Sequence, residues 1–141
     1  MNKELPYILL ADDDPDDLVI FSEAIGELNP DVAIQTVIDG KELIEFLDAC
    51  DRDELPTLIV LDYKMPVISG PEVLQRLAAN PAYVHIPRIV WSTSERLKDI
   101  ETCLQLGATA YFKKPASSIE IAHFRQQIND IFLSQIQHSR S

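Results

Sequence analysis

Two five-residue runs, each rich in apolar side chains and each followed at once by aspartate, restrict the folds open to this chain of 141 residues. The first run, residues 7–11, stops at three consecutive aspartates, and the second, residues 57–61, stops at Asp62. Apolar runs of this length without polar alternation are typical of strands buried on both faces of a parallel sheet. The sequence therefore predicts a central sheet covered on both sides, with acidic residues at the ends of its strands.

Helical patterns alternate with such strands along the chain. Strands are expected at residues 7–11, 32–38, 57–61, 88–91 and 110–112. Apolar residues spaced three and four apart mark one face of each helix: Leu18, Phe21, Ile25 and Leu28; Leu43, Phe46, Leu47 and Cys50; Val73, Leu74 and Leu77; Leu97, Ile100 and Leu104; Ile121, Phe124, Ile128 and Ile131. Gly107 is expected to end the fourth helix, and Ser117 or Ser118 to cap the fifth. This alternation predicts one α/β domain over residues 1–141 with a parallel sheet.

Charge and composition exclude several classes of function. The net charge is −11, and the acidic excess lies in residues 1–72, so a phosphate backbone would be repelled and direct nucleic-acid binding is not expected. No apolar run reaches the ~20 residues that cross a bilayer, and no signal-peptide pattern is present, so no membrane association is expected. Cys50 and Cys103 are isolated thiols without disulfide or zinc-site spacing, which fits a reducing cytoplasm.

Polar residues gather where the predicted strands end. Asp12, Asp13 and Asp14 follow the first strand, Asp62 the third, Ser92 and Thr93 the fourth, and Lys114 the fifth. Taken singly, each has an ordinary explanation as a cap, a turn residue or a surface residue. Ligands of open α/β sheets bind outside the carboxyl ends of the strands, so their shared position favours one pocket. Several carboxylates at close range require a cation, and oxygen ligands with room for water favour Mg²⁺.

Four sequence motifs resemble one known family. LLADDDPDD, LIVLDYKMPVISG, RIVWSTS and GATAYFKKP are similar, in this order and spacing, to the receiver domains of two-component response regulators, including the single-domain chemotaxis regulator. The resemblance runs from Tyr7 to about Ile136. It implies a doubly wound, flavodoxin-like fold with five parallel strands in the order 2-1-3-4-5 and five helices.

The resemblance also implies the chemistry of the pocket. Asp62 would be the phosphoacceptor, and Mg²⁺ would be held by Asp12, Asp13, Asp62 and the backbone carbonyl of Lys64. Lys64 also brings a positive side chain to the pocket rim, and the direction of its effect on hydrolysis of the phosphoryl group stays open.

Further residues would bind the phosphoryl group and couple its binding to a conformational change. Ser92 would be the switch hydroxyl, with Thr93 as a second candidate, Lys114 the phosphoryl-binding lysine and Tyr111 the rotating aromatic. The family also implies a cis peptide before Pro115. Trp91, large for a residue beside the switch hydroxyl, is expected to pack under the fourth helix.

The implied function is that of a stand-alone signalling domain rather than an enzyme. A sensor histidine kinase or a phosphotransfer protein would donate the phosphoryl group, and the face formed by helix four, strand five and helix five would then bind a downstream protein. A homodimer through that face or through the last helix is a further expectation. For the last helix it rests on apolar residues that point to more than one side: Ile131, Phe132, Leu133 and Ile136.

Three alternative functions compete with this interpretation. A haloacid dehalogenase-type phosphatase would use Asp12 and Asp14, but Pro15 stands where that family prefers Thr or Val, and no acidic pair follows Lys114. A flavin-binding domain of the same fold class needs a phosphate loop rich in Ser, Thr and Gly, where this chain has aspartates. A receiver that signals without phosphorylation would not need the full set of acidic, hydroxyl and lysine residues.

Overall fold

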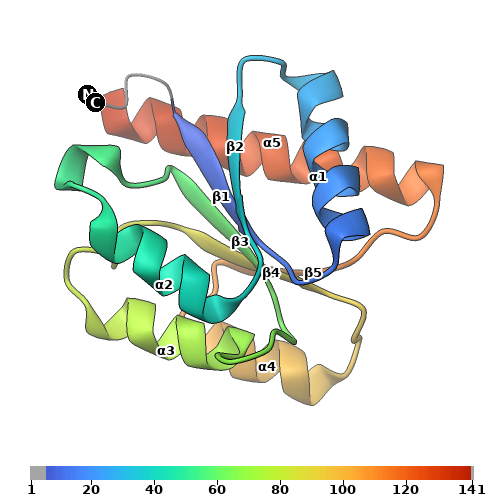
Figure 1. The fold of residues 1–141 in the computed structure, drawn as a ribbon. Coiled ribbons are helices and arrows are strands. Elements are labelled where there is room, and N and C mark those ends of the chain that lie inside the picture. The colour runs from blue at the N-terminus through green and yellow to red at the C-terminus, as the bar shows by residue number, and fades with distance from the viewer. Residues whose placement is uncertain (1–5, 141) are drawn as a thin grey trace.

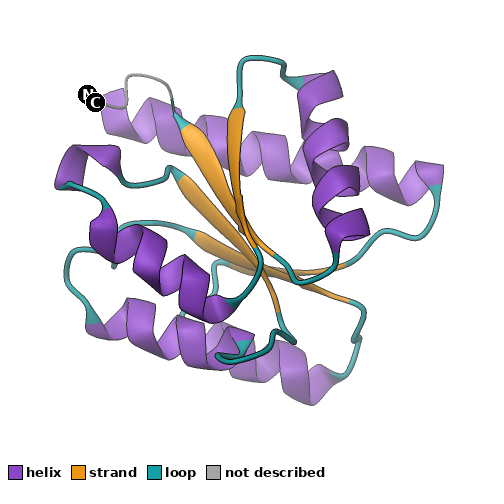
Figure 2. Ribbon diagram, in the orientation of Figure 1, coloured by secondary structure: helices purple, strands orange, loops and turns teal. Residues whose placement is uncertain are grey.

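The structure, a computed structural model, describes residues 6–140 and contains five strands and five α-helices in strict alternation (Figures 1 and 2). The strands are β1 (Tyr7–Ala11), β2 (Ala33–Val37), β3 (Leu58–Asp62), β4 (Arg88–Ser92) and β5 (Ala110–Lys113). The helices are α1 (Pro15–Leu28), α2 (Gly40–Ala49), α3 (Gly70–Ala79), α4 (Leu97–Gln105) and α5 (Ser118–Arg140), with a 3₁₀ turn at Arg52–Glu54. No helix within the described residues is long and apolar enough to span a membrane.

All strand pairs are parallel, and the sheet order is β2-β1-β3-β4-β5, so the predicted doubly wound fold is confirmed. The order reverses direction at β1 and β3, which is where ligands bind in sheets of this kind. In the register, Asp62 pairs with Trp91 and Ser92 pairs with Lys113. The carboxyl ends of the three central strands and of β5 therefore meet along one edge of the sheet.

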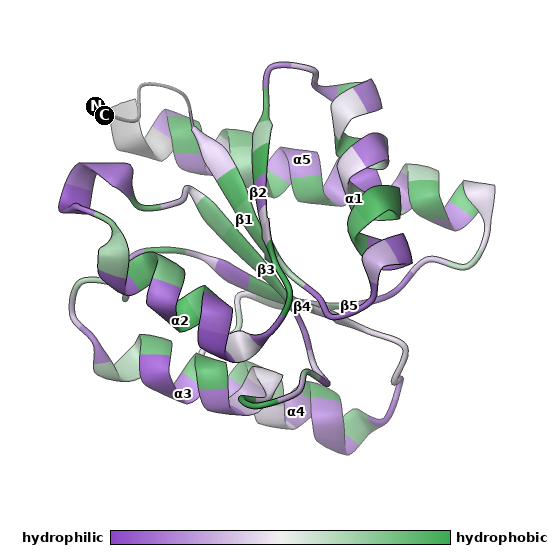
Figure 3. Ribbon diagram, in the orientation of Figure 1, coloured by the Kyte–Doolittle hydropathy of each residue, from purple (hydrophilic) through white to green (hydrophobic). Residues whose placement is uncertain are grey.

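The sheet separates two hydrophobic cores, because successive strand residues point to opposite faces. In Figure 1, α1 and α5 cover one face, and α2, α3 and α4 cover the other. Strand side chains alternate between the cores: Leu9, Ile59 and Val90 on the side of α2, α3 and α4, and Ile8, Val60 and Trp91 on the side of α1 and α5. In Figure 3 the central strands β1 and β3 are mostly coloured as hydrophobic, whereas hydrophobic and hydrophilic residues alternate along the helices.

Helix α4 buries a different face from the one predicted. Leu97 and Leu104 are 68% and 46% exposed, whereas Asp99 and Cys103 are buried. The prediction was wrong because this short helix has apolar residues on several sides. Its contacts with the rest of the fold, rather than its sequence pattern, determine which side is buried. The carboxylate of Asp99 accepts hydrogen bonds from Tyr63 and Ser94, which offset the cost of its burial.

Trp91 also departs from the prediction. Its ring lies between Phe21 of α1 (centroids 5.4 Å apart) and Phe124 of α5 (5.5 Å apart, nearly parallel), not under α4. The pleat decides this, because Val90 already fills the α4 side of β4 and its neighbour must point the other way.

The apolar side chains of the last helix are mostly core residues. Phe132 is 2% exposed, and Ile131 and Ile136 pack partly buried against the same cluster, so only Leu133 of the four is well exposed. The prediction that they form a contact surface is therefore wrong for Phe132, because α5 crosses the whole α1 side of the sheet. At the other end of α5, Ser117 rather than Ser118 is the cap, since its Oγ accepts from the backbone N–H of Glu120. Gly107, at φ +107°, ends α4 as predicted.

Candidate functional site

The turn after β1 gives the adjacent residues Asp12 and Asp13 different degrees of exposure to solvent. Asp14 caps α1, its side chain accepting from the backbone N–H of Asp16, and Pro15 supplies a fixed φ at the first helical position. One carboxylate oxygen of Asp12 accepts from the backbone N–H of Asp14 at 2.9 Å. These bonds hold Asp12 fully buried, while Asp13 stays exposed at the mouth of the pocket.

The loop after β3 shapes the neighbourhood of Asp62. Gly70 begins α3 so close to the strand that a Cβ there would lie 2.7 Å from the carbonyl oxygen of Asp62. This close approach explains the glycine that ends the MPVISG motif. Val67, 72% exposed, has φ +70°, a conformation that costs a β-branched residue about 1–2 kcal/mol. The loop is thus held in a strained shape beside the pocket.

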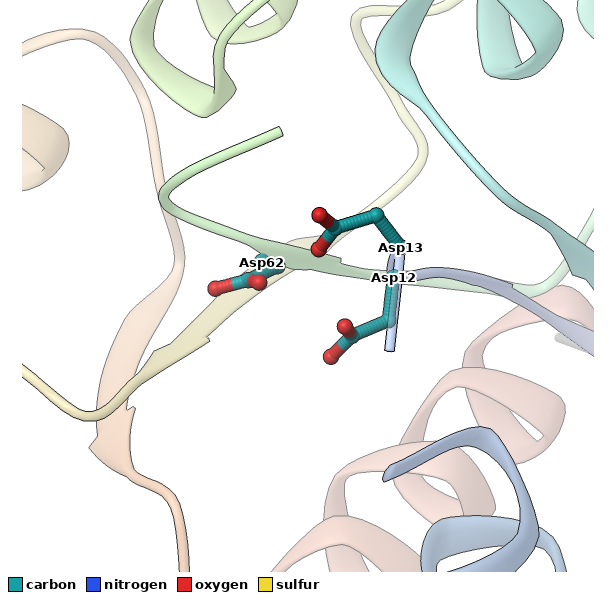
Figure 4. A group of neighbouring side chains, drawn as sticks. All are labelled: Asp12, Asp13 and Asp62. Atoms are coloured by element: carbon teal, nitrogen blue, oxygen red, sulfur yellow. The ribbon is translucent and has the colours of Figure 1, made fainter. Parts of the chain in front are cut away.

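Three carboxylates converge at this edge of the sheet. Asp12 and Asp13 come from the end of β1 and Asp62 from the end of β3, and one oxygen of each lies within 4.8 Å of the others (Figure 4). Asp62 is 7% exposed. Oxygen ligands at this spacing, two of them buried and one open to water, fit a small hard divalent cation such as Mg²⁺. The predicted acidic group is therefore brought together by the fold.

Lys114, just past the end of β5, is the cation that faces this group. Its Nζ lies 2.8 Å from Asp12 Oδ2, 2.8 Å from Asp17 Oδ2 and 3.2 Å from Asp62 Oδ2. The contact with Asp17 is a hydrogen bond, whereas Asp12 Oδ2 has only the ion pair. The ammonium also lies 5.0 Å from the centroid of the Trp91 ring, within the range of a cation–π contact.

The pocket is electrostatically unbalanced. Burial raises the pKa of Asp12 to about 6, since Lys114 and the backbone N–H of Asp14 only partly compensate and the charge of Asp62 adds to the effect. Burial likewise raises the pKa of Asp62, against the influence of Lys114 and of the Lys64 backbone N–H. Burial disfavours the charged form of Lys114, but its carboxylate partners outweigh burial and raise its pKa.

The remaining predicted residues lie beside this pocket. Ser92 is 3% exposed at the end of β4, its Oγ accepts from the backbone N–H of Ser94, and its carbonyl accepts from the backbone N–H of Lys114 at 2.7 Å. The next residue, Thr93, is exposed. Tyr111 on β5 is partly buried against the α4-side core, and its hydroxyl donates to the carbonyl of Ser94 at 3.0 Å. Lys64 is exposed at the rim.

The peptide bond before Pro115 is trans, so the expectation of a cis bond is wrong. The trans form is the intrinsically favoured isomer of an X-Pro bond by about 0.5–1 kcal/mol.

Two contacts of this region were not anticipated from the sequence. Asp17 reaches Lys114 across 97 residues, and Asp99 of α4 accepts from the hydroxyl of Tyr63 across 36. A signal for Asp17 was present, because the DDDPDD run places it in the first turn of α1. Asp99 gave no such signal, since a charged residue on a short helix is normally solvent-exposed.

Comparison with known proteins identifies the fold family. The sequence model of the response regulator receiver domain family matches residues 8–125. The chain belongs to this receiver domain family. The matched part runs from β1 into the first third of α5 and contains every residue of the acidic pocket and Lys114.

Two relatives differ in how much of their own length is similar to this chain. A two-component response regulator of Oryza sativa subsp. japonica, ORR13, is 30% identical, and the alignment covers 82% of this chain and 92% of that protein. A probable cyclic di-GMP phosphodiesterase of Vibrio cholerae is 33% identical over 78% of this chain. The aligned part is 23% of that longer protein, so the likeness concerns that part alone.

Two solved receiver structures match closely. The phosphorylated cyanobacterial phytochrome response regulator RcpA superimposes with a TM-score of 0.82 at 29% identity, covering 92% of this chain and 94% of the other. The Mn²⁺-bound response regulator Rcp1 superimposes with a TM-score of 0.73 at 27% identity, covering 87% and 91%. As a receiver domain, the chain belongs to two-component signalling proteins.

Proposed function

We propose that this receiver domain accepts a phosphoryl group on Asp62 and thereby changes its affinity for a protein partner. The proposal is carried by the carboxylates of Asp12, Asp13 and Asp62, which lie together, and by Lys114, which forms ion pairs with two of them. That arrangement combines a nucleophilic carboxylate, a place for a divalent cation and a positive group for the incoming phosphoryl oxygens. The phosphorylated state of the structural neighbour RcpA supports the same chemistry here.

The donor in this proposal is a phosphohistidine of a sensor histidine kinase or a phosphotransfer protein. A carboxylate oxygen of Asp62 attacks phosphorus, the P–N bond breaks, and the imidazole leaves with the electron pair and takes up a proton. The transferred group carries charge on its three outer oxygens. Lys114, 3.2 Å from Asp62 Oδ2, is placed to pair with one of them.

The side chains of Asp12, Asp13 and Asp62 and the backbone carbonyl of Lys64 would hold Mg²⁺. The raised pKa of Asp12 fits this role, because a buried carboxylate that lacks compensation is stabilised by a nearby cation. Bound Mg²⁺ supplies positive charge that offsets the negative charge of the phosphoryl group. The Mn²⁺-bound form of the neighbour Rcp1 supports a divalent cation at this kind of site.

The signal would pass from the pocket through β4 and β5. In the proposal the hydroxyl of Ser92 leaves the backbone N–H of Ser94 and binds a phosphoryl oxygen, with the exposed Thr93 as the second candidate. The hydroxyl of Tyr111 is bonded to the same Ser94, so movement of this loop changes the position of the aromatic ring. The α4–β5–α5 face would then bind a downstream protein or a second copy of the chain. We place this receiver domain, in which Cys50 and Cys103 form no disulfide, in the cytoplasm.

Intact-mass spectrometry after incubation with acetyl phosphate tests the proposal. We expect one phosphoryl adduct on the parent in Mg²⁺, none in EDTA and none on Asp62→Asn. Asp99→Asn is the matched control, since it changes another buried aspartate outside the acidic group, and it should keep the adduct. An adduct that persists on Asp62→Asn, or that maps to Asp12 as the phosphatase alternative requires, would reject the assignment.

A further inference from the structure

One of the carboxylate partners of Lys114 lies outside the acidic group proposed to bind Mg²⁺. Its ammonium has three N–H donors and three carboxylate neighbours, of which Asp12 and Asp62 belong to the group that can bind a metal. The third neighbour, Asp17, lies outside that group, in the first turn of α1. The Lys114 side chain is 10% exposed and that of Asp17 23%, so their 2.8 Å hydrogen bond is largely shielded from water.

A divalent cation changes what Lys114 can pair with. When Asp12 and Asp62 serve as metal ligands, their negative charge is shared with the metal, and the metal itself repels the ammonium. Asp17 keeps its full charge because it does not belong to the metal-binding set. The ring of Trp91, 5.0 Å from Nζ, is the other described group that favours a cation at this place.

We propose that Asp17 is a positioning residue that holds Lys114 beside Asp62 while a divalent cation occupies the carboxylates of Asp12, Asp13 and Asp62. Without Asp17, the metal would drive the lysine side chain out of the pocket, and the phosphoryl group would arrive with one positive partner missing. The role in phosphoryl transfer rests on the proposed function. The effect on the position of Lys114 rests on the contacts alone.

The sole tryptophan provides a readout that does not depend on phosphorylation. Because Lys114 lies over the Trp91 ring, fluorescence of this residue should differ between the parent and Lys114→Met. Both proteins are titrated with Mg²⁺, together with Asp17→Asn and the control Asp16→Asn, which removes the same charge from the exposed neighbouring position. Lys114→Met at equal Mg²⁺ concentration corrects for any direct effect of the ion on the indole.

We expect Asp17→Asn to resemble the parent without Mg²⁺ and to reach the emission of Lys114→Met at saturating Mg²⁺. The parent and Asp16→Asn should stay distinct from Lys114→Met throughout. Asp17→Glu, which keeps the charge, should behave more like the parent. An Asp17→Asn titration that coincides with the parent at all Mg²⁺ concentrations overturns the inference. Thermal unfolding of each variant confirms that it is folded.

The second measurement is the initial rate of phosphorylation by acetyl phosphate. Asp17→Asn should lower the rate on the order of tenfold, the size of a coupling between contacting charged groups, and should have no effect in a Lys114→Met background. A faster rate in Asp17→Asn, or an equal loss in both backgrounds, would contradict action through Lys114. If even the parent takes up no phosphoryl group, the proposed function fails, and the fluorescence titration still decides the role of Asp17.

Discussion

Two buried aspartates near the same edge of the sheet have opposite environments. Asp12, fully buried, shares its pocket with Asp13 and Asp62, and Lys114 forms ion pairs with two of these three carboxylates. Asp99, 3% exposed, has no second carboxylate among its hydrogen-bond partners and accepts from three neighbours: the hydroxyls of Tyr63 and Ser94 and the guanidinium of Arg96. Burial raises the pKa of Asp12 to about 6, whereas hydrogen bonds from Arg96 and Ser94 lower the pKa of Asp99.

The difference shows that burial of a charge does not by itself mark a functional site. The carboxylate of Asp99 is satisfied by its donors and therefore stabilises the junction between β3 and α4. The negative charge of Asp12, Asp13 and Asp62 is only partly offset by nearby positive charge. Such an excess of buried charge is typical of sites where a bound ligand can neutralise it. The number of donors for each carboxylate separates the two cases.

The largest expected change in stability comes from removing the buried negative charge of Asp12. Without divalent cations, Asp12→Asn should raise the free energy of unfolding at pH 7 by about 3 kcal/mol, since the folded state no longer buries an unfavourable charge. Urea unfolding in EDTA measures this gain. Added Mg²⁺ should stabilise the parent and have much less effect on the variant, because the variant has lost a ligand. A variant less stable than the parent in EDTA would contradict the comparison.

The contributions of Asp12 and Asp99 to the free energy of unfolding should change with pH in opposite directions. Between the ordinary pKa of 3.8 and about 6, the folded state binds more protons at Asp12 than the unfolded chain, so the contribution of Asp12 to stability falls as pH rises. Asp99, with a lowered pKa, contributes stability that is present above 3.8 and is lost as pH falls through its folded value. The gain from Asp12→Asn should therefore be small at pH 4, grow to about pH 6 and stay constant above it. A gain that is equal at pH 4 and pH 7 would exclude Asp12 as its source.

A smaller effect of opposite direction is expected at the satisfied carboxylate. Asp99→Asn should lower the Tm in thermal unfolding, because the amide places an NH₂ among the donors of Ser94, Arg96 and Tyr63. The loss should be smaller than the gain in Asp12→Asn, since the Arg96 side chain is 75% exposed and can be solvated instead. Stabilisation by Mg²⁺ should remain at the parent level. A variant with raised Tm would place Asp99 in the same class as Asp12.

The smallest effect is expected from Tyr63→Phe, which removes one of several donors to Asp99 at 3.2 Å. Asp99 keeps its remaining partners, so the loss in the free energy of unfolding should be about 0.5 kcal/mol. Urea unfolding of the parent and the variant at pH 7 measures it. A loss as large as that of Asp99→Asn would mean that Tyr63 carries the whole network.

Much of the candidate site could be predicted because it depends on strand ends. The runs before Asp12 and Asp62 end at recognisable residues, and parallel strands bring their carboxyl ends to one edge of the sheet. Once the strands were assigned, proximity of Asp12, Asp13, Asp62 and Lys114 followed from topology alone. The Ser117 cap and the Gly107 helix end were likewise local, since each involves residues within a few positions.

The sequence by itself therefore determined the alternation of elements, the sheet class and the acidic edge, all of which arise from local apolar patterns and chain direction. Tertiary structure alone decided which face α4 buries, on which side Trp91 lies and which aspartate besides the predicted set reaches Lys114. Two of these features depend on distant partners, since Tyr63 lies 36 residues from Asp99 and Lys114 lies 97 residues from Asp17. A side chain's charge or apolar character does not specify a distant partner, because that choice is made by the packing of whole helices against the sheet.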